Sequence, residues 1–218
     1  MGSGVMPVSQ IDLETADCFL LVGINPKETF PMMAKRIMRA KEKGARVILV
    51  DPRDTVTARE LADIHLQLKI GTDVALINSM MKIVLDEGLE NKQFIKERTT
   101  GIEELRKHLA SLDLEGLGDI SKVPLDLILE TAQCLAKAKT ASVLYNQGLN
   151  QHTTGADGIK ALASLALITG QYGRPATGLS PTRGQINGEG SGDMGCLNVF
   201  YPGFKKVGTG AAETFEDL

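Results

Sequence analysis

The chain has 218 residues, of which 43% are hydrophobic and 23% are charged. This is the balance of an ordinary globular protein, and the length suits one well-buried α/β domain. The net charge of −3, without a basic block, disfavours a nucleic-acid partner. No apolar run reaches the roughly 20 residues of a membrane-spanning helix. Residues 1–10 lack the features of a signal peptide, so we expect a cytoplasmic chain with no membrane partner.

The cysteines and histidines do not predict a metal site. Cys18, Cys134 and Cys196 are far apart in the sequence and form no C-x-x-C pair. Zinc and iron–sulfur sites need closely spaced thiolates, so neither is indicated. The three histidines are equally scattered. We expect the thiols to be buried or incidental in a reducing compartment.

Buried strands and amphipathic helices alternate along the first 169 residues. Residues 18–23 and 46–50 are apolar runs typical of strands buried on both faces, and residues 31–43 between them predict a helix. This is a βαβ unit, whose crossover should be right-handed. The remaining predicted elements are a helix over 57–62, a strand over 64–68, a helix from Thr72 or Asp73 to about 87, helical structure over 91–112, a helix beginning at Ser121, a strand over 141–145 and a helix over 158–168.

This pattern predicts an α/β fold: a Rossmann-like, three-layer domain over residues 1–169, with a mainly parallel sheet and helices on both faces. From residue 170 the composition changes, with eight glycines between residues 170 and 195 and few apolar residues. Such a segment loses much backbone entropy on ordering and buries little to offset it. We therefore expect residues 170–218 to form a separate glycine-rich segment and tail, ordered by a ligand or a neighbouring domain or partly disordered.

Polar or glycine-rich turns follow the predicted strands, at residues 23–26, 51–53, 71–73 and 147–148. Ligands bind at the carboxyl ends of the strands in an open parallel sheet, so these turns should converge on one edge. Asp51 stands where nucleotide-binding folds place a ribose or base contact. The backbone N–H groups of Thr72 and Asp73 could bind a phosphate or a guanine carbonyl. Exposed turns are also polar for purely structural reasons, so the turns alone leave a nucleotide site open.

Several common sites are not supported by the sequence. There is no G-x-G-x-x-G motif for an ordinary dinucleotide and no G-x-x-x-x-G-K-[ST] phosphate loop. No Ser-His-Asp or Cys-His arrangement suggests a nucleophilic enzyme. An NAD-dependent enzyme is therefore disfavoured.

Taken in order, the turns resemble the consecutive blocks of molybdopterin oxidoreductase catalytic subunits, and most of all the formate dehydrogenase alpha subunits. The resemblance covers nearly the whole chain. The blocks that carry it are VGINPKETFP (22–31), VDPR (50–53), ADIHLQL (62–68), GTDVAL (71–76), QGLNQ (147–151), LITG (167–170), GRP (173–175), RGQ (183–185), GDMG (192–195) and YPGF (201–204).

The resemblance implies that this region is one of two Rossmann-like domains that hold a bis(molybdopterin guanine dinucleotide) with molybdenum or tungsten. It implies that one guanosine and its pyrophosphate are held by Asn25, Asp51, Arg53, Gly71, Thr72 and Asp73. The pterin would be approached by Gln147, Gly148 and Gln151. Arg183 would orient formate through its charge and fork of donors, with Gly184 and Gln185 beside it, for two-electron oxidation to carbon dioxide.

The departures from the family are equally informative. The family's iron–sulfur cysteines, its cysteine or selenocysteine metal ligand and its C-terminal domain have no counterpart here. Phe30 stands where the family usually has His, and residues 186–191 replace a block usually richer in Asn and Gln. A reading frame that starts just after an in-frame selenocysteine codon would explain the missing ligand.

We therefore expect a cofactor-binding part of a longer enzyme, inactive and without cofactor by itself. Its partners would be formate or a similar small substrate, the other domains of the same subunit and an electron-transfer subunit. The alternative is a stand-alone nucleotide-binding or scaffold module without redox activity.

Overall fold

A computed structural model of the chain describes residues 6–182, 188–196 and 200–206. Its contacts divide the chain into two units, Met1–Thr182 and Arg183–Leu218, which are described separately. In the part that the structure describes, no helix is long and apolar enough to cross a membrane.

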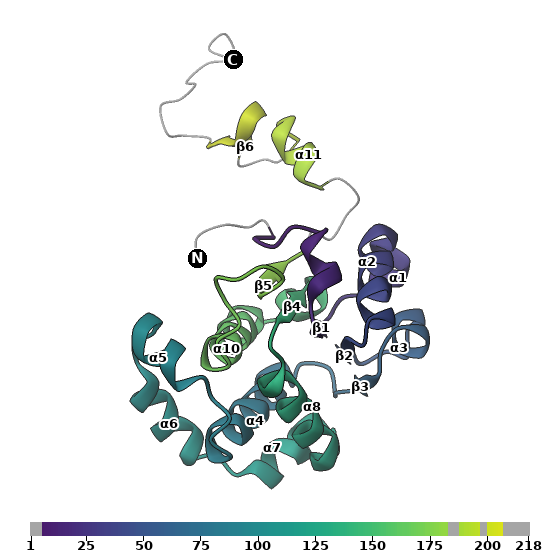
Figure 1. Ribbon diagram of the computed structural model, residues 1–218. Helices are drawn as coiled ribbons and strands as arrows, with labels where there is room; N and C mark the ends of the chain where they lie inside the picture. Colours follow the sequence, from purple (N-terminus) through teal and green to yellow (C-terminus); the bar gives the residue numbers. More distant parts are fainter. Residues whose placement is uncertain (1–5, 183–187, 197–199, 207–218) are drawn as a thin grey trace. The chain divides into compact units, whose positions relative to one another are not determined.

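The first unit is built on a five-stranded sheet (Figure 1). Its strands lie in the order β3-β2-β1-β4-β5, and every neighbouring pair is parallel. The chain therefore builds outward from β1 in one direction and returns through β4 in the other, which is the doubly wound arrangement. The strands are β1 (Cys18–Val22), β2 (Arg46–Val50), β3 (Ile64–Leu66), β4 (Ala141–Tyr145) and β5 (Gly178–Pro181).

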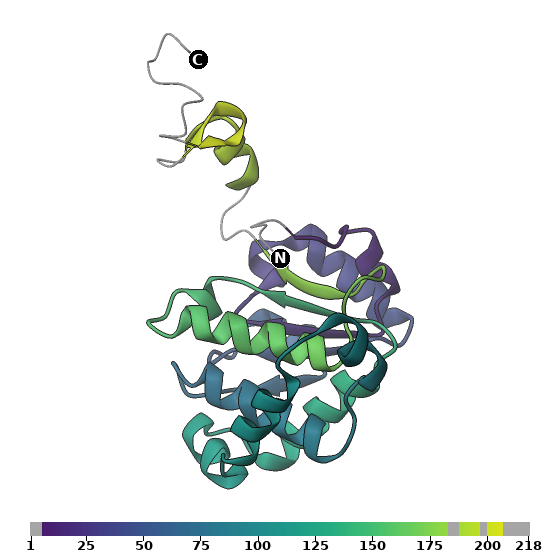
Figure 2. The same ribbon diagram turned by 90° about the vertical axis from the view of Figure 1, so that its left-hand side faces the viewer.

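Helices cover both faces of this sheet (Figures 1 and 2). One face packs against the 3₁₀ helix η1 (Asp12–Thr15) and the helices α1 (Pro26–Thr29), α2 (Pro31–Glu42) and α3 (Val56–Glu60). The other face packs against α4 (Asp73–Asp86), α8 (Leu125–Lys137) and α10 (Gly155–Ile168). The short helices α5 (Lys92–Arg98), α6 (Ile102–Ala110) and α7 (Leu114–Ser121) pack against this second group, and α9 (Gln147–Asn150) precedes α10.

Alternation along each strand explains the continuous apolar runs of the sequence. In β1, Phe19 and Leu21 enter the core beside α2, whereas Leu20 and Val22 enter the core beside α4 and α8. Both faces of the sheet are covered, so every residue of β1 is buried. The predicted α/β fold, with a parallel sheet and helices on both faces, is confirmed.

Several predicted elements need correction. Ser121 does not begin a helix: it ends α7, because Lys122 adopts a left-handed φ of 61° and Pro124 then caps α8. Helix α7 itself was not predicted, although Asp113 caps it by accepting a hydrogen bond from Gly116 N at 2.9 Å. The helical stretch 91–112 divides into α5 and α6 at Gly101, whose φ is 83°. The third strand ends at Leu66 and not at Leu68.

The glycine-rich segment contributes to the sheet. Residues 178–181 form β5, which pairs with β4 over four positions, and Ala176 is fully buried. The first unit thus continues to Thr182. In the second unit the structure describes α11 (Gly188–Asp193), an antiparallel pair of β6 (Phe200–Tyr201) with β7 (Lys205–Lys206), and the 3₁₀ helix η2 (Pro202–Phe204) between these strands.

Candidate functional site

The turns that follow β1, β2, β3 and β4 lie along one edge of the sheet, because all four strands run in the same direction. We call this edge the rim and define it as residues 23–25, 51–53, 67–73 and 146–148. The order of the strands reverses between β1 and β4, and such a switch point is where doubly wound folds bind ligands.

At the switch point the turns after β1 and β4 touch through their backbones. The N–H of Gly148 donates to the carbonyl oxygen of Gly23 at 3.1 Å, and the N–H of Gly23 donates to that of Val50 at 2.9 Å. A Cβ added to Gly148 would lie 2.6 Å from the Cα of Gly23. Both glycines are therefore required by packing, independently of any ligand.

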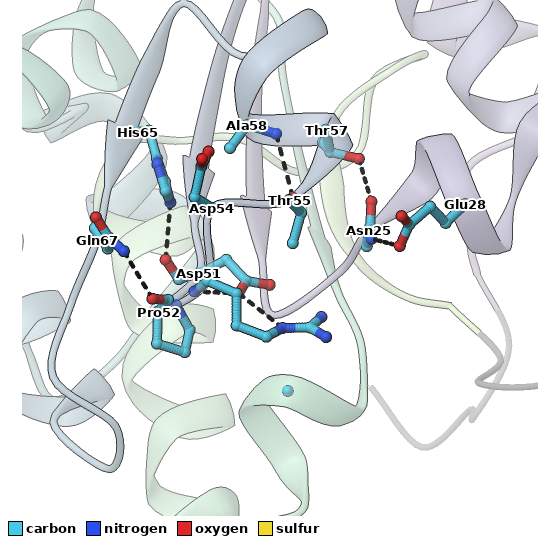
Figure 3. A network of polar contacts seen from close by, with 12 residues as sticks. Asn25, Glu28, Asp51, Pro52, Asp54, Thr55, Thr57, Ala58, His65 and Gln67 are labelled. Atoms are coloured by element: carbon cyan, nitrogen blue, oxygen red, sulfur yellow. Dashed lines mark hydrogen bonds and ion pairs between the residues drawn. The ribbon is translucent and has the colours of Figure 1, made fainter.

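The turn after β2 is tied to β3 by two side chains (Figure 3). Nε2 of His65 lies 2.8 Å from the carbonyl oxygen of Asp51, and Nε2 of Gln67 donates to that of Pro52 at 3.0 Å. A carbonyl oxygen only accepts, so Nε2 of His65 carries the proton. The carboxylate of Asp51, only 5% exposed, accepts a hydrogen bond from Arg53 N at 2.9 Å. The side chain of Arg53 is 70% exposed, with Nε 3.5 Å from Asp51 Oδ1.

Asn25 follows β1 at the rim, but its side chain is engaged inside the protein. Its Oδ1 accepts a hydrogen bond from Thr57 Oγ1 at 2.5 Å, and its Nδ2 donates to Glu28 (Figure 3). Asn25 is only 6% exposed. The side-chain amide of Asn25 thus links Glu28 in α1 to Thr57 in α3, and these contacts stabilise the turn after β1.

Helix α4 begins at the rim with Gly71, Thr72 and Asp73. Gly71 turns the chain with a φ of 82°. Thr72 is the N-cap residue, as predicted, yet its hydroxyl makes no capping bond and donates to Lys69 O at 2.5 Å. Thr72 therefore caps none of the first N–H groups of α4, although the N–H of Asp73 interacts with its own carboxylate. The positive end of the helix dipole faces the rim.

Asp73 is the most perturbed acid at the rim. It is 9% exposed, and burial raises the pKa of its carboxyl group above the usual value, with a further increase from the negative charge of Asp51. His152 acts in the opposite direction. Burial is the main cause of this shift and the charge of Asp51 the smallest, so a ligand that donates hydrogen bonds to Asp73 would stabilise its ionised form.

The turn after β4 carries the remaining predicted residues. Asn146 accepts a hydrogen bond from Gln147 N at 2.7 Å and begins α9. Gln151, which follows α9, is exposed. His152 hydrogen bonds through Nε2 to Gly148 O at 2.9 Å and so fixes the end of this turn.

The structure thus brings Asn25, Asp51, Arg53, the residues 71–73 and the residues 147–148 to one edge. Arg183, Gly184 and Gln185 lie outside the described residues. Sequence reasoning did not single out His65 and Gln67, which hold the turn after β2. Their alternation with buried Ile64, Leu66 and Leu68 was the available signal.

Comparison with known proteins assigns the chain to a family. The family model described as molybdopterin oxidoreductase matches residues 3–213. The chain belongs to the molybdopterin oxidoreductase family. A relative, the F420-dependent formate dehydrogenase subunit alpha of Methanocaldococcus jannaschii, is 46% identical over 209 residues, which cover 96% of this chain and 31% of that protein. The chain thus spans about a third of that relative's length.

The chain is also similar to proteins that are not formate dehydrogenases. The assimilatory nitrate reductase catalytic subunit of Bacillus subtilis is 37% identical over 196 residues, covering 90% of this chain and 28% of that protein. The structure of acetylene hydratase from Pelobacter acetylenicus superposes with a TM-score of 0.69 at 24% identity, covering 77% of this chain and 25% of that one. This structural likeness supports the fold alone.

The family implies a molybdopterin cofactor, and the rim offers groups with which an anionic ligand could interact. The exposed guanidinium of Arg53 and the uncapped start of α4 offer donors to phosphate oxygens. The carboxylates of Asp51 and Asp73 offer acceptors to a base with N–H groups. Among the described residues, no group of three or more His, Cys, Asp or Glu side chains is placed to hold a metal ion.

Proposed function

We propose that the rim binds one guanosine and its pyrophosphate from a molybdopterin guanine dinucleotide, within an enzyme that oxidises formate. The observation that carries the proposal is the pairing of donors with acceptors at one edge. Arg53 and the start of α4 supply positive charge and N–H groups, and two buried carboxylates supply acceptors.

The donors suit the pyrophosphate. The N-terminus of a long helix binds anions through free N–H groups and through its dipole, and α4 has 14 residues. The guanidinium of Arg53 adds a charge-assisted hydrogen bond to a phosphate oxygen. Gly71 has no side chain, and no other atom lies within 4 Å of the position where its Cβ would be. This point of the turn is therefore open.

The acceptors suit guanine better than adenine. Guanine presents two neighbouring N–H donors on its Watson–Crick edge, whereas adenine presents an acceptor nitrogen between its amino group and a C–H. Asp51 and Asp73 lie on the same rim and can only accept hydrogen bonds when ionised. Guanine would satisfy these carboxylates, and adenine would leave acceptors facing each other. Binding of guanine should lower the pKa of Asp73 towards its usual value.

The remaining roles rest on the resemblance of the sequence to the family. Gln147, Gly148 and Gln151 would approach the pterin, and Arg183 would orient the carboxylate of formate, with Gly184 and Gln185 beside it. The bound cofactor would supply two-electron redox chemistry through its molybdenum or tungsten ion. The chain's own residues bind the nucleotide and fix the orientation of the substrate. The greater identity to the formate dehydrogenase subunit than to the nitrate reductase supports formate as the substrate.

Calorimetric titration of the chain with GDP tests the nucleotide site, since GDP carries the guanosine and the pyrophosphate without the pterin. We expect micromolar binding of GDP and at least tenfold weaker binding of ADP. Arg53→Ala should weaken GDP binding by about tenfold, the equivalent of one charge-assisted hydrogen bond of about 1.5 kcal/mol. The matched control is Arg59→Ala, because Arg59 is 57% exposed and pairs with Asp54. Equal affinity for ADP, or unchanged binding in Arg53→Ala, would contradict the proposed site.

The reaction is tested on the protein purified from its source with its cofactor, with formate and nitrate supplied separately. Formate-dependent reduction of a dye supports formate oxidation, and Arg183→Lys should lower kcat/KM for formate because lysine keeps the charge but loses the fork. Consumption of nitrate without formate oxidation would contradict the proposal that formate is the substrate. GDP binding without either reaction would favour the stand-alone binding module.

A further inference from the structure

Two cysteines that are 116 positions apart in the sequence meet in the fold (18 to 134). Cys18 is the first residue of β1, and Cys134 lies in the last turn of α8, which packs on β1. Both side chains belong to the same core cluster, where Cys134 packs against the buried residues that include Cys18, and the two thiols influence each other's pKa. Cys18 is only 1% exposed and Cys134 is half-buried, so solvent reaches the pair from the side of Cys134.

The pKa values of the two thiols are shifted in opposite directions. The thiol of Cys18 donates to the sulfur of Cys134, and this hydrogen bond, with the positive charge of Arg46, lowers the pKa of Cys134 to about 7. Burial and the contact with Cys134 raise the pKa of Cys18 well above its usual range. Partial burial and the negative charges of Glu130 and Asp63 oppose this lowering of the pKa of Cys134. Arg46 stays in place through an ion pair with Glu130 at 3.1 Å.

The pair lies at the opposite end of β1 from the rim. Cys18 begins the strand, and the rim begins after Val22, at Gly23. At about 3.3 Å per residue, the two places are separated by roughly 15 Å along the strand. Chemistry at the thiols therefore leaves the nucleotide-binding edge open.

We propose that Cys18 and Cys134 form an oxidation site, at which a peroxide converts the two thiols into an intramolecular disulfide. A half-buried thiol at the surface and a fully buried thiol behind it are the arrangement of an attacking cysteine and a resolving cysteine. The third cysteine, Cys196, is exposed and belongs to the second unit.

The chemistry proceeds in two balanced steps. The thiolate of Cys134 attacks one oxygen of hydrogen peroxide, the O–O bond breaks, and the departing hydroxide takes a proton to become water. This leaves Cys134 as a sulfenic acid. The sulfur of Cys18 then attacks the sulfur of Cys134, forms the S–S bond and expels a second water, which carries away the thiol proton. One peroxide is reduced by two electrons, and the two thiols are oxidised by two electrons.

Peptide mapping of the whole chain after mild treatment with hydrogen peroxide tests this site. We expect a cross-linked peptide that contains Cys18 and Cys134, a mass smaller by two hydrogen atoms, and reversal by a dithiol reductant. The number of free thiols should fall from three to one. GDP binding should be the same before and after oxidation, because the disulfide is remote from the rim.

Two variants separate a reactive pair from two structural thiols. In Cys18→Ala, which removes both the resolving thiol and the hydrogen-bond donor, Cys134 should stop at a sulfenic acid that dimedone traps. Its alkylation by iodoacetamide near pH 7 should also slow by about 15-fold, because a thiol with a pKa near 8.5 is only a few per cent ionised there. In Cys134→Ser, Cys18 should stay reduced, whereas Cys196→Ser should leave the disulfide unchanged.

Three results would overturn the proposal. The first is that both thiols stay free after peroxide treatment that oxidises Cys196. The second is that the oxidised chain carries separate sulfinic or sulfonic acids without a cross-link. The third is that alkylation of Cys134 proceeds at the same rate with and without Cys18, since the hydrogen bond would then have no effect on its reactivity.

Discussion

Gly148→Ala tests the backbone contact between the turns after β1 and β4. The new methyl group would lie 2.6 Å from the Cα of Gly23, 2.7 Å from its carbonyl oxygen and 3.0 Å from its carbonyl carbon. These are backbone atoms and cannot rotate away. Gly23 is also held from its other side, where its N–H donates to Val50 O at 2.9 Å. The clash can be relieved only by moving the two turns apart.

The cost follows from three contributions. Overpacking costs about 1–3 kcal/mol, and the two backbone hydrogen bonds of Gly23, with Gly148 and with Val50, contribute about 1 kcal/mol each. Alanine in the short helix α9 recovers up to about 1 kcal/mol relative to glycine. The net loss in the free energy of unfolding is therefore about 2–4 kcal/mol, which lowers Tm by roughly 4–16 °C for a chain of this size.

Urea denaturation followed by far-ultraviolet circular dichroism measures this loss, and the slope m should not change. Gly88→Ala is the control, since Gly88 has a φ of 66° but nothing within 4 Å of its added Cβ. It should lose only about 1–2 kcal/mol from backbone strain. A Gly148→Ala protein that unfolds at the same urea concentration as the parent would refute the steric argument.

Three further substitutions test the rim and the helical layer. His65→Ala removes the hydrogen bond to the turn 51–53, so the free energy of unfolding should fall by about 1 kcal/mol and calorimetry should show GDP binding weakened a few-fold. Asp73→Asn should make unfolding less dependent on pH. The folded-state pKa of Asp73 is raised, so its stabilising contribution is present below the usual value of 3.8 and is lost as the pH rises through the folded value. Parent and variant should therefore diverge in urea titrations as the pH rises above the usual value of 3.8, with the parent losing more stability. Arg106→Ala removes the partner of Glu90, whose side chain is 3% exposed, at 2.8 Å, and urea denaturation should show a loss of about 1–3 kcal/mol.

Two of these substitutions have matched controls at more exposed positions. Gln67→Ala removes a hydrogen bond from the same turn but at an exposed position, so its effect on stability should be smaller than that of His65→Ala. Arg59→Ala breaks an ion pair whose side chains are 57% and 58% exposed, and it should cost less than about 1 kcal/mol. If Arg106→Ala cost no more than Arg59→Ala, the burial of Glu90 would not have the importance assigned to it.

Strands and helices were predictable where burial imposes a period on the sequence. β1, β2 and β4 are covered on both faces, so each appears as a mainly apolar run without alternation, with Arg46 and Ser142 as the polar exceptions. β5 was missed because its four residues, GLSP, include glycine and proline, which are rare inside strands. It forms because β4 offers a free edge for pairing. Helix α7 was missed because two of its residues, Gly116 and Gly118, weaken the helical pattern.

The position of the candidate site was predictable from the sequence, but the hydrogen bonds of its side chains were not. Polar turns after parallel strands must meet at one edge, which placed Asp51 and Asp73 together without any structural information. The engagement of Asn25 by Thr57, 32 positions away, depends on how α3 packs beside α1. The bond from His65 to the turn after β2 depends on the register of β2 with β3. Neither contact has a periodic signal in the sequence.

The backbone contact at Gly23 and Gly148 also has a mechanical consequence. Hydrogen bonds continue across the turns from Val50 through Gly23 to Gly148, beyond the ends of the strands themselves. The half of the sheet made by β1, β2 and β3 is therefore held to the half made by β4 and β5 at the rim. A hinge motion between the two halves would have to break these hydrogen bonds, so the turns of the rim should move together as one rigid body. The amide hydrogens of Gly23 and Gly148 should accordingly be among the slowest of any turn in the first unit to exchange with solvent.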